Sequence, residues 1–122
     1  MKKALFLIFI LLMSACNTLD PAEDSDALYI RVANSSPIDF NSVYLSFPGA
    51  EHTFGPIKSG RSSPYQKFEQ AYRYGFIEVK SDHKSYVLQP IDYVGETPLK
   101  NGRYTFELDI QDNHVTLNNK RD

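Results

Sequence analysis

The chain has 122 residues, of which 42% are hydrophobic, and it carries 13 Lys and Arg against 15 Asp and Glu. This length suits a single domain, and the lack of a basic surplus argues against nucleic acid as a partner. Cys16 is the only cysteine, so a disulfide within the chain is excluded.

The first 15 residues have the features of a secretory signal. Lys2 and Lys3 precede about ten apolar residues, 4–13, whereas a helix that spans a bilayer needs roughly 20. The small residues Ser14 and Ala15 then stand directly before Cys16. Cys16 itself is open to several interpretations: a core thiol, a catalytic nucleophile, half of an intermolecular disulfide, or a site of lipid attachment.

Polar and acidic residues follow Cys16, which is unlike the setting of a core thiol, and no histidine is near it in sequence as a nucleophile requires. Ser14, Ala15 and Cys16 resemble the lipobox of bacterial lipoproteins, with Met13 where Leu is commonest. The resemblance implies cleavage after Ala15 and acyl chains, such as palmitate, on Cys16. These chains would anchor the protein to a membrane of the bacterial cell envelope. In some enterobacterial lipoproteins an Asp directly after the acylated Cys signals retention in the inner membrane. This chain has Asn17 at that position, so the resemblance favours the outer membrane over the inner one.

The sequence divides into a signal peptide over 1–15, an acylated cysteine with an acidic tether over 16–27, and a domain over 28–122. Removal of the signal leaves 107 residues with 11 basic and 15 acidic side chains. The tether contains Pro21 and no helix or strand periodicity. Its eleven residues after Cys16 reach at most roughly 35–40 Å when extended.

From Leu28 onward the apolar residues alternate with period two, which predicts strands. Residues 28–34 and 42–47 show this alternation, and shorter strands are predicted at 52–55 and, on a sheet edge because of Pro64, at 63–68. Residues 69–80 change parity after Phe76, so we expect a strand with a bulge near Gly75. A turn at 81–84 and a strand that ends at Pro90 follow.

The last segment gives the clearest signal. Tyr104, Phe106, Leu108 and Ile110 alternate with polar residues that include Thr105, and Val115 and Leu117 continue the apolar face after the turn at 111–114. This pattern predicts a terminal hairpin. Seven to eight short strands without a helix indicate an all-β fold, an antiparallel β-sandwich.

The phrases "IKSGRSSPY" and "LKNGRYTFEL" resemble passages of immunoglobulin-like and transthyretin-like modules in exported bacterial proteins. In those modules a Gly-x-Tyr that opens a strand sets a turn and buries the ring, which corresponds to Gly102 and Tyr104 here. In its layout the whole chain resembles the small lipoproteins that are common in Bacteroidota.

No nucleophile elbow, phosphate-binding loop or metal-ligand spacing occurs, and His52, His83 and His114 stand apart. We therefore expect no enzyme, cofactor or metal site. Exposed rings at Tyr72 and Tyr74 beside Arg73, together with Tyr93, are the candidate binding residues, although β-strands and small cores also favour aromatic residues. The loop over 89–102 is either a binding loop or a crossover with Ile91, Tyr93, Val94 and Leu99 packed inward. We favour the crossover, because four apolar residues are many for a solvated loop.

The sequence thus predicts an envelope lipoprotein whose sandwich is a non-enzymatic interaction or assembly module with an envelope protein as its partner. A ligand-binding module, for example for glycans, is the alternative.

Overall fold

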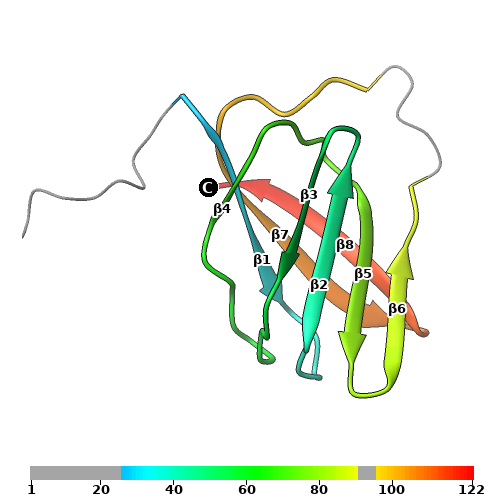
Figure 1. Ribbon diagram of the computed structural model, residues 1–122. Coiled ribbons are helices and arrows are strands. Elements are labelled where there is room, and N and C mark those ends of the chain that lie inside the picture. The colour runs from blue at the N-terminus through cyan, green and yellow to red at the C-terminus, as the bar shows by residue number, and fades with distance from the viewer. Residues whose placement is uncertain (1–25, 91–95) are drawn as a thin grey trace, which may run out of the picture.

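The structure is a computed structural model that describes residues 26–90 and 96–122. The described residues form eight strands and no helix (Figure 1). The strands are β1 (Leu28–Asn34), β2 (Ser42–Phe47), β3 (Ala50–Phe54), β4 (Gln66–Phe68), β5 (Phe76–Ser81), β6 (Lys84–Leu88), β7 (Gly102–Gln111) and β8 (His114–Arg121). The prediction of an all-β fold with about eight short strands is confirmed.

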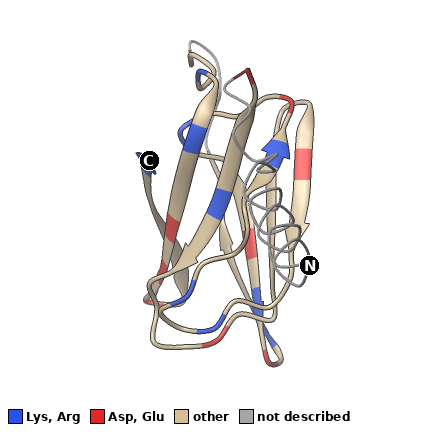
Figure 2. Ribbon diagram, turned by 90° about the vertical axis from the view of Figure 1, so that its left-hand side faces the viewer, with Lys and Arg blue, Asp and Glu red and all other residues tan. Residues whose placement is uncertain are grey.

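The strands form two four-stranded sheets in the orders β4-β1-β7-β8 and β3-β2-β5-β6. Figure 2 views this β-sandwich from its β3 and β4 side and separates the two layers. The prediction of a purely antiparallel sandwich is wrong in one respect, because β1 and β7 pair in parallel, with Leu28 opposite Gly102. The two strands start at the same end of the sandwich, and such a long-range pairing leaves no local signal in the sequence.

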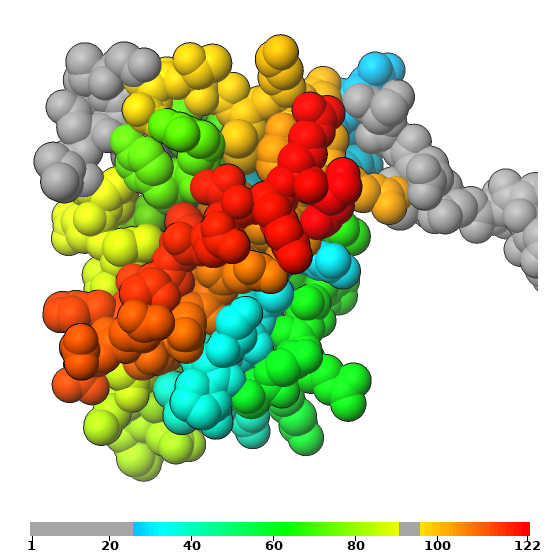
Figure 3. Space-filling model, turned by 180° about the vertical axis from the view of Figure 1, so that it is seen from behind, coloured from blue at the N-terminus to red at the C-terminus, as the bar shows by residue number. Residues whose placement is uncertain are grey.

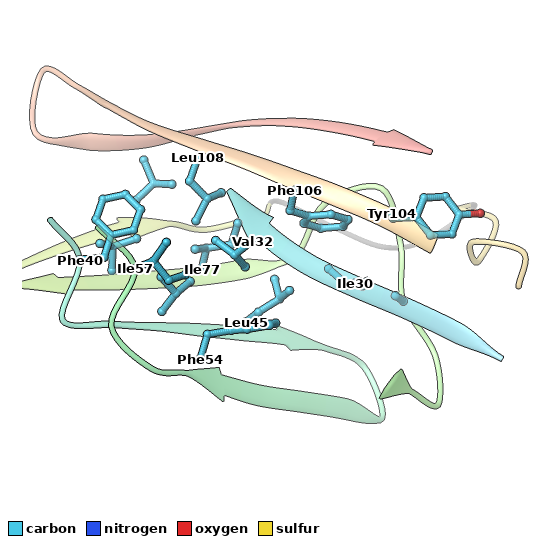
Figure 4. Close-up of a cluster of buried hydrophobic side chains, with 14 of the residues drawn as sticks. Ile30, Val32, Phe40, Leu45, Phe54, Ile57, Ile77, Tyr104, Phe106 and Leu108 are labelled. Atoms are coloured by element: carbon cyan, nitrogen blue, oxygen red, sulfur yellow. The ribbon is translucent and has the colours of Figure 1, made fainter. Parts of the chain in front are cut away.

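The predicted alternation determines which side chains enter the core. Leu28, Ile30 and Val32 of β1 are buried between half-buried neighbours, and β2 buries alternate residues in the same way. Phe106 and Leu108 of β7 are fully buried against them (Figure 4). Every buried hydrophobic residue of the described part lies between Ala27 and Val115. We therefore expect a chain that starts after Cys16 to keep the whole of this core.

The predicted turns at 81–84 and 111–114 are both two-residue hairpin loops. Asp112 and Asn113 have φ angles of 52° and 63°, as a type I′ turn requires. Asn and Asp tolerate this left-handed conformation better than other residues with a side chain. The short predicted strands at 52–55 and 63–68 correspond to β3 and to the edge strand β4.

The predicted strand over 69–80 with a bulge at Gly75 is wrong for its first half, because β5 begins only at Phe76. Residues 69–75 form a loop that passes closely over β2. A Cβ atom at position 75 would lie 2.8 Å from both the Phe47 ring and the Ser46 carbonyl oxygen. Glycine therefore permits this close approach rather than a bulge.

A buried polar side chain holds the end of β1. Asn34 is 1% exposed, and its amide nitrogen donates to the carbonyl oxygens of Ile38 (2.8 Å) and Ile57 (3.0 Å). Its side-chain oxygen accepts from the backbone N–H and the hydroxyl of Ser36. These bonds fix the turn out of β1 and satisfy groups that would be costly to bury unpaired.

The sandwich has two poles. Residue 26 and the start of β7 lie at one of them, which we call the N-terminal pole (Figure 1). The link over 35–41 and the turn at Asp82 and His83 lie together at the opposite end, which we call the far pole, where the Asn41 N–H donates to the Lys80 carbonyl. The length of β1 separates the two poles by about 20 Å.

Candidate functional site

Two of the predicted binding residues, Arg73 and Tyr74, lie together in the loop before β5. The Arg73 side chain is 67% exposed, and Tyr74 is half-buried. Tyr72 packs against the core, and its hydroxyl accepts a hydrogen bond from Gln70 (3.3 Å). Tyr93 and Cys16 lie outside the described residues.

Arg73 and Tyr74 line a groove of about 410 Å³ together with Leu88, Leu117 and Asn119, and we call it the Arg73 groove. The Asn119 amide donates to the Arg73 carbonyl, which joins the loop to β8. Figure 3 shows this loop (bright green) beside the C-terminal half of β8 (red). The groove thus combines two aliphatic side chains, one aromatic ring and one exposed guanidinium group.

A second depression of about 360 Å³ lies on the other side of Arg73 and is lined by residues 96–100, Tyr104 and Arg121. The Arg73 guanidinium forms an ion pair with Glu96 at 3.4 Å, but an exposed pair of this kind contributes little to stability. Leu99 packs against the core, and its N–H donates to the Ala71 carbonyl at 2.8 Å. The inward packing predicted for Leu99 is confirmed, whereas Ile91 and Val94 lie outside the described residues.

The edge of β8 beside the Arg73 groove offers unpaired backbone groups. The Asp122 N–H donates to the Arg103 carbonyl, so every second residue counted back from Asp122 directs its backbone N–H and C=O toward β7. Val115, Leu117 and Asn119 lie between those residues, and their backbone N–H and C=O groups therefore point away from β7. In the part of the chain that the structure describes, no other strand pairs with this edge.

A polar cluster on the outer face of the β1-β7-β8 sheet was not predicted. The Asp122 carboxylate accepts hydrogen bonds from the Tyr65 hydroxyl (2.5 Å) and the Thr105 hydroxyl (2.7 Å), and Arg31 Nε donates to Thr105 (2.9 Å). The Arg31 and Arg103 guanidinium carbons lie 5.0 and 5.4 Å from the centre of the Tyr65 ring. Thr105 is only 2% exposed, although it lies on the face of β7 opposite the core residues.

The cluster changes the proton affinities of its members. Partial burial and the hydrogen bond to Asp122 raise the pKa of Tyr65. Burial alone would raise the pKa of Asp122, but the hydrogen bonds from Tyr65 and Thr105 and the charge of Arg31 outweigh it and lower this pKa. The arrangement holds the chain near β4 against the end of β8. Its polar side chains form hydrogen bonds with one another, which is typical of a structural contact.

Tyr65→Phe is expected to cost about 1 kcal/mol of unfolding free energy near neutral pH, because it removes a donor to a partly exposed carboxylate. The lowered pKa of Asp122 means that this stability is present above the ordinary aspartate value of 3.8 and is lost as the pH falls through the lowered value. Urea unfolding should therefore show the difference between parent and variant narrowing in acid. Tyr29→Phe is the control, since the Tyr29 hydroxyl has no hydrogen bond among the described side chains. A difference that stays constant down to strong acid would contradict this account.

No three His, Cys, Asp or Glu side chains come together as a metal site within residues 26–90 and 96–122. His52 stacks edge-on against Phe54 at 4.8 Å, and His83 and His114 are exposed at the two hairpins. No helix in those same residues is long and apolar enough to cross a membrane.

Comparisons with known proteins show a likeness of fold. No family model and no curated protein matches the chain. The chain is similar to a solved structure described as "NMR structure of the protein from Eubacterium rectale", with 14% identity and a TM-score of 0.56. The match covers 85% of this chain and 96% of the other. At this identity the likeness concerns the fold alone.

Proposed function

We propose that this chain is a lipid-anchored protein of the bacterial cell envelope, most consistent with the outer membrane, whose β-sandwich binds another envelope protein and is not an enzyme. The anchor is supported by the apolar run over 4–13 followed by Ser14, Ala15 and Cys16. Among the described residues the first strand begins at Leu28. We assign the acidic residues between Cys16 and this strand as the tether.

We also infer that the sandwich is of the immunoglobulin-like or transthyretin-like type. The support is at the start of β7, where Gly102 has a φ angle of 144° and the Tyr104 ring is 6% exposed. The Tyr104 hydroxyl donates to the carbonyl of Lys100, four residues upstream, at 2.8 Å. This is the arrangement of the tyrosine corner of immunoglobulin-like domains.

The observation that supports a protein partner is the Arg73 groove beside the unpaired edge of β8. An extended segment of a partner that lay along this edge would form backbone hydrogen bonds with β8. Its apolar side chains would contact Leu88 and Leu117, and Tyr74 would supply a large rigid contact area of the kind that dominates interface energies. Arg73 stands exposed at the rim and would select for an acidic or neutral segment.

Site-specific cross-linking in intact cells tests this proposal. A photoreactive amino acid at Tyr74 is expected to give one discrete adduct with an envelope protein, and Arg73→Glu is expected to weaken or abolish it. The control position is Lys80, an exposed residue on the outer face of the other sheet. Equal adducts from both positions, or none from Tyr74 in any growth condition, would contradict the proposed surface.

The alternative is a glycan-binding surface at Tyr72, Arg73, Tyr74 and Tyr93. The geometry around the Arg73 groove supports it less. The Tyr72 ring packs against the core, and Tyr93 lies outside the described residues. Of the tyrosines among the described candidates, only Tyr74 therefore offers a ring on which a sugar could stack. For this reason we place the protein partner first.

A further inference from the structure

A third recess lies at the far pole, away from the Arg73 groove. It is a cleft of about 700 Å³ between the link over 35–41 and the β5–β6 hairpin. This volume falls within the range of about 300–1,000 Å³ that is typical of small-ligand sites. Figure 1 shows the two segments side by side at the end of the sandwich opposite residue 26.

The walls of the cleft are fixed to each other by hydrogen bonds. The Ser81 hydroxyl donates to the Asp39 carbonyl (2.6 Å), and the Asp82 N–H donates to the Asn41 side-chain oxygen (2.6 Å). The backbone N–H of Ser59 donates to one oxygen of the Asp39 carboxylate at 2.9 Å. A ligand would therefore meet walls that are already held in place, which lowers the entropic cost of binding.

These bonds leave further polar atoms available toward the cleft. Asn41 keeps both of its amide hydrogens, and Asp39 keeps its second carboxylate oxygen. The Asp82 carboxylate and the Lys84 ammonium group have no partner among the described residues. The cleft thus presents donors and acceptors together, with two carboxylates beside one ammonium group.

The rest of the lining consists of Pro37, Ile38, the Tyr86 side chain and the exposed imidazole of His83. Ile38 packs against the core, and the Tyr86 side chain is 9% exposed. Tyr86 lines the cleft, and its hydroxyl forms no hydrogen bond within the described residues. A ligand in the cleft would meet a small apolar surface and a phenol group that can both donate and accept.

We propose that the far-pole cleft binds a neutral saccharide. Sugars bring closely spaced hydroxyl groups, which need donors and acceptors in the same place, and apolar C–H faces, which pack on side chains such as Ile38 and Tyr86. Asp39 and Asp82 disfavour an anionic ligand, and Lys84 beside them weakens the attraction for a cation. The proposal does not depend on the protein partner. The cleft lies at the end of the sandwich opposite residue 26 (Figure 1).

Saturation-transfer NMR tests the proposal on the full chain in micelles of a detergent without a sugar head group. The probes are maltose, cellobiose and N,N′-diacetylchitobiose, with glucose 6-phosphate as the charged counterpart. At least one neutral disaccharide is expected to bind, with glucose 6-phosphate weaker. Tyr86→Phe, which keeps the ring, and Lys84→Ala, which alters an exposed residue, should each weaken binding about 2- to 10-fold, the effect of losing one hydrogen bond.

Arg73→Ala is the matched control and should leave sugar binding unchanged, while it affects the cross-link from Tyr74. The proposal is overturned if none of the three disaccharides binds or if glucose 6-phosphate binds best. It is also overturned if binding responds to Arg73→Ala and not to the two far-pole variants, which would place the sugar in the Arg73 groove. Thermal unfolding of each variant shows that it is folded, so that a loss of binding reports on the cleft.

Discussion

Phe106→Ala is expected to lower the unfolding free energy by about 3–5 kcal/mol, a large share of the stability of a domain of this size. Phe106 is fully buried on β7, between β1 and β8, and its ring lies edge-on to Phe47 of the other sheet with centroids 6.0 Å apart. Truncation leaves a cavity between the two layers that neighbouring side chains fill only in part. Leu108→Ala on the same face should cost about 2–5 kcal/mol.

Glu107→Ala is the matched control on the opposite face of the same strand. Glu107 is half-exposed, with Lys120 at 3.1 Å and a hydrogen bond from Asn118, so its loss should cost no more than about 0.5–1 kcal/mol. Urea unfolding of a chain that starts at residue 17 measures all three variants. Equal losses for Phe106→Ala and Glu107→Ala would show that β7 is buried on both faces, against the register described above.

Cys16→Ser is expected to abolish both acylation and cleavage after Ala15, which leaves a precursor without lipid. A hydroxyl group cannot form the thioether, and under the proposed processing the unmodified precursor is not cleaved after Ala15. Two or three acyl chains provide stable anchoring of the mature chain at about 0.8 kcal/mol for each buried CH₂ group, whereas the variant keeps only the apolar run over 4–13. Metabolic labelling with an alkyne fatty acid, followed by membrane fractionation, detects the lipid, and the size of the chain on a gel shows whether residues 1–15 are kept.

Tyr29→Phe serves as the control in this experiment too, since it should keep both the label and the membrane fraction. A Cys16→Ser protein that is still labelled would place the lipid on another residue. An unlabelled parent chain would contradict the proposed lipid anchor.

The strands with a period-two pattern could be predicted from the sequence because one face of each meets the core. Ile30, Leu45 and Phe106 lie where their parity places them, and Asp112 and Asn113 form the predicted turn. The local pattern determines how such a strand is oriented, because a shift of its pairing by one residue would turn all of its apolar side chains from the core into solvent.

The features that the sequence did not predict concern contacts between residues that are far apart in the chain. Thr105 is polar and alternates with the core residues, yet Arg31 and Asp122 cover it from two other strands. Residues 69–75 contain aromatic residues at strand spacing, but the space over Phe47 admits only a glycine backbone at position 75. In both cases tertiary packing overrides a local preference.

The candidate sites were predictable to a lesser degree. Arg73 and Tyr74 are brought to one groove as neighbours in sequence, whereas Leu88 and Asn119 reach it from other strands. The far-pole cleft joins Asp39 and Asn41 to residues about 40 positions later, and neither segment carries a motif. No pattern along the chain indicates such a recess before the fold is known.

The mass of the N-terminal peptide of the mature protein, isolated from membranes, tests the lipoprotein account most directly. We predict a peptide that begins at Cys16 and carries a diacylglyceryl group on its sulfur, with a further acyl chain on its amine. A mature chain that begins at any other residue, or one in which Cys16 is unmodified, would contradict the account.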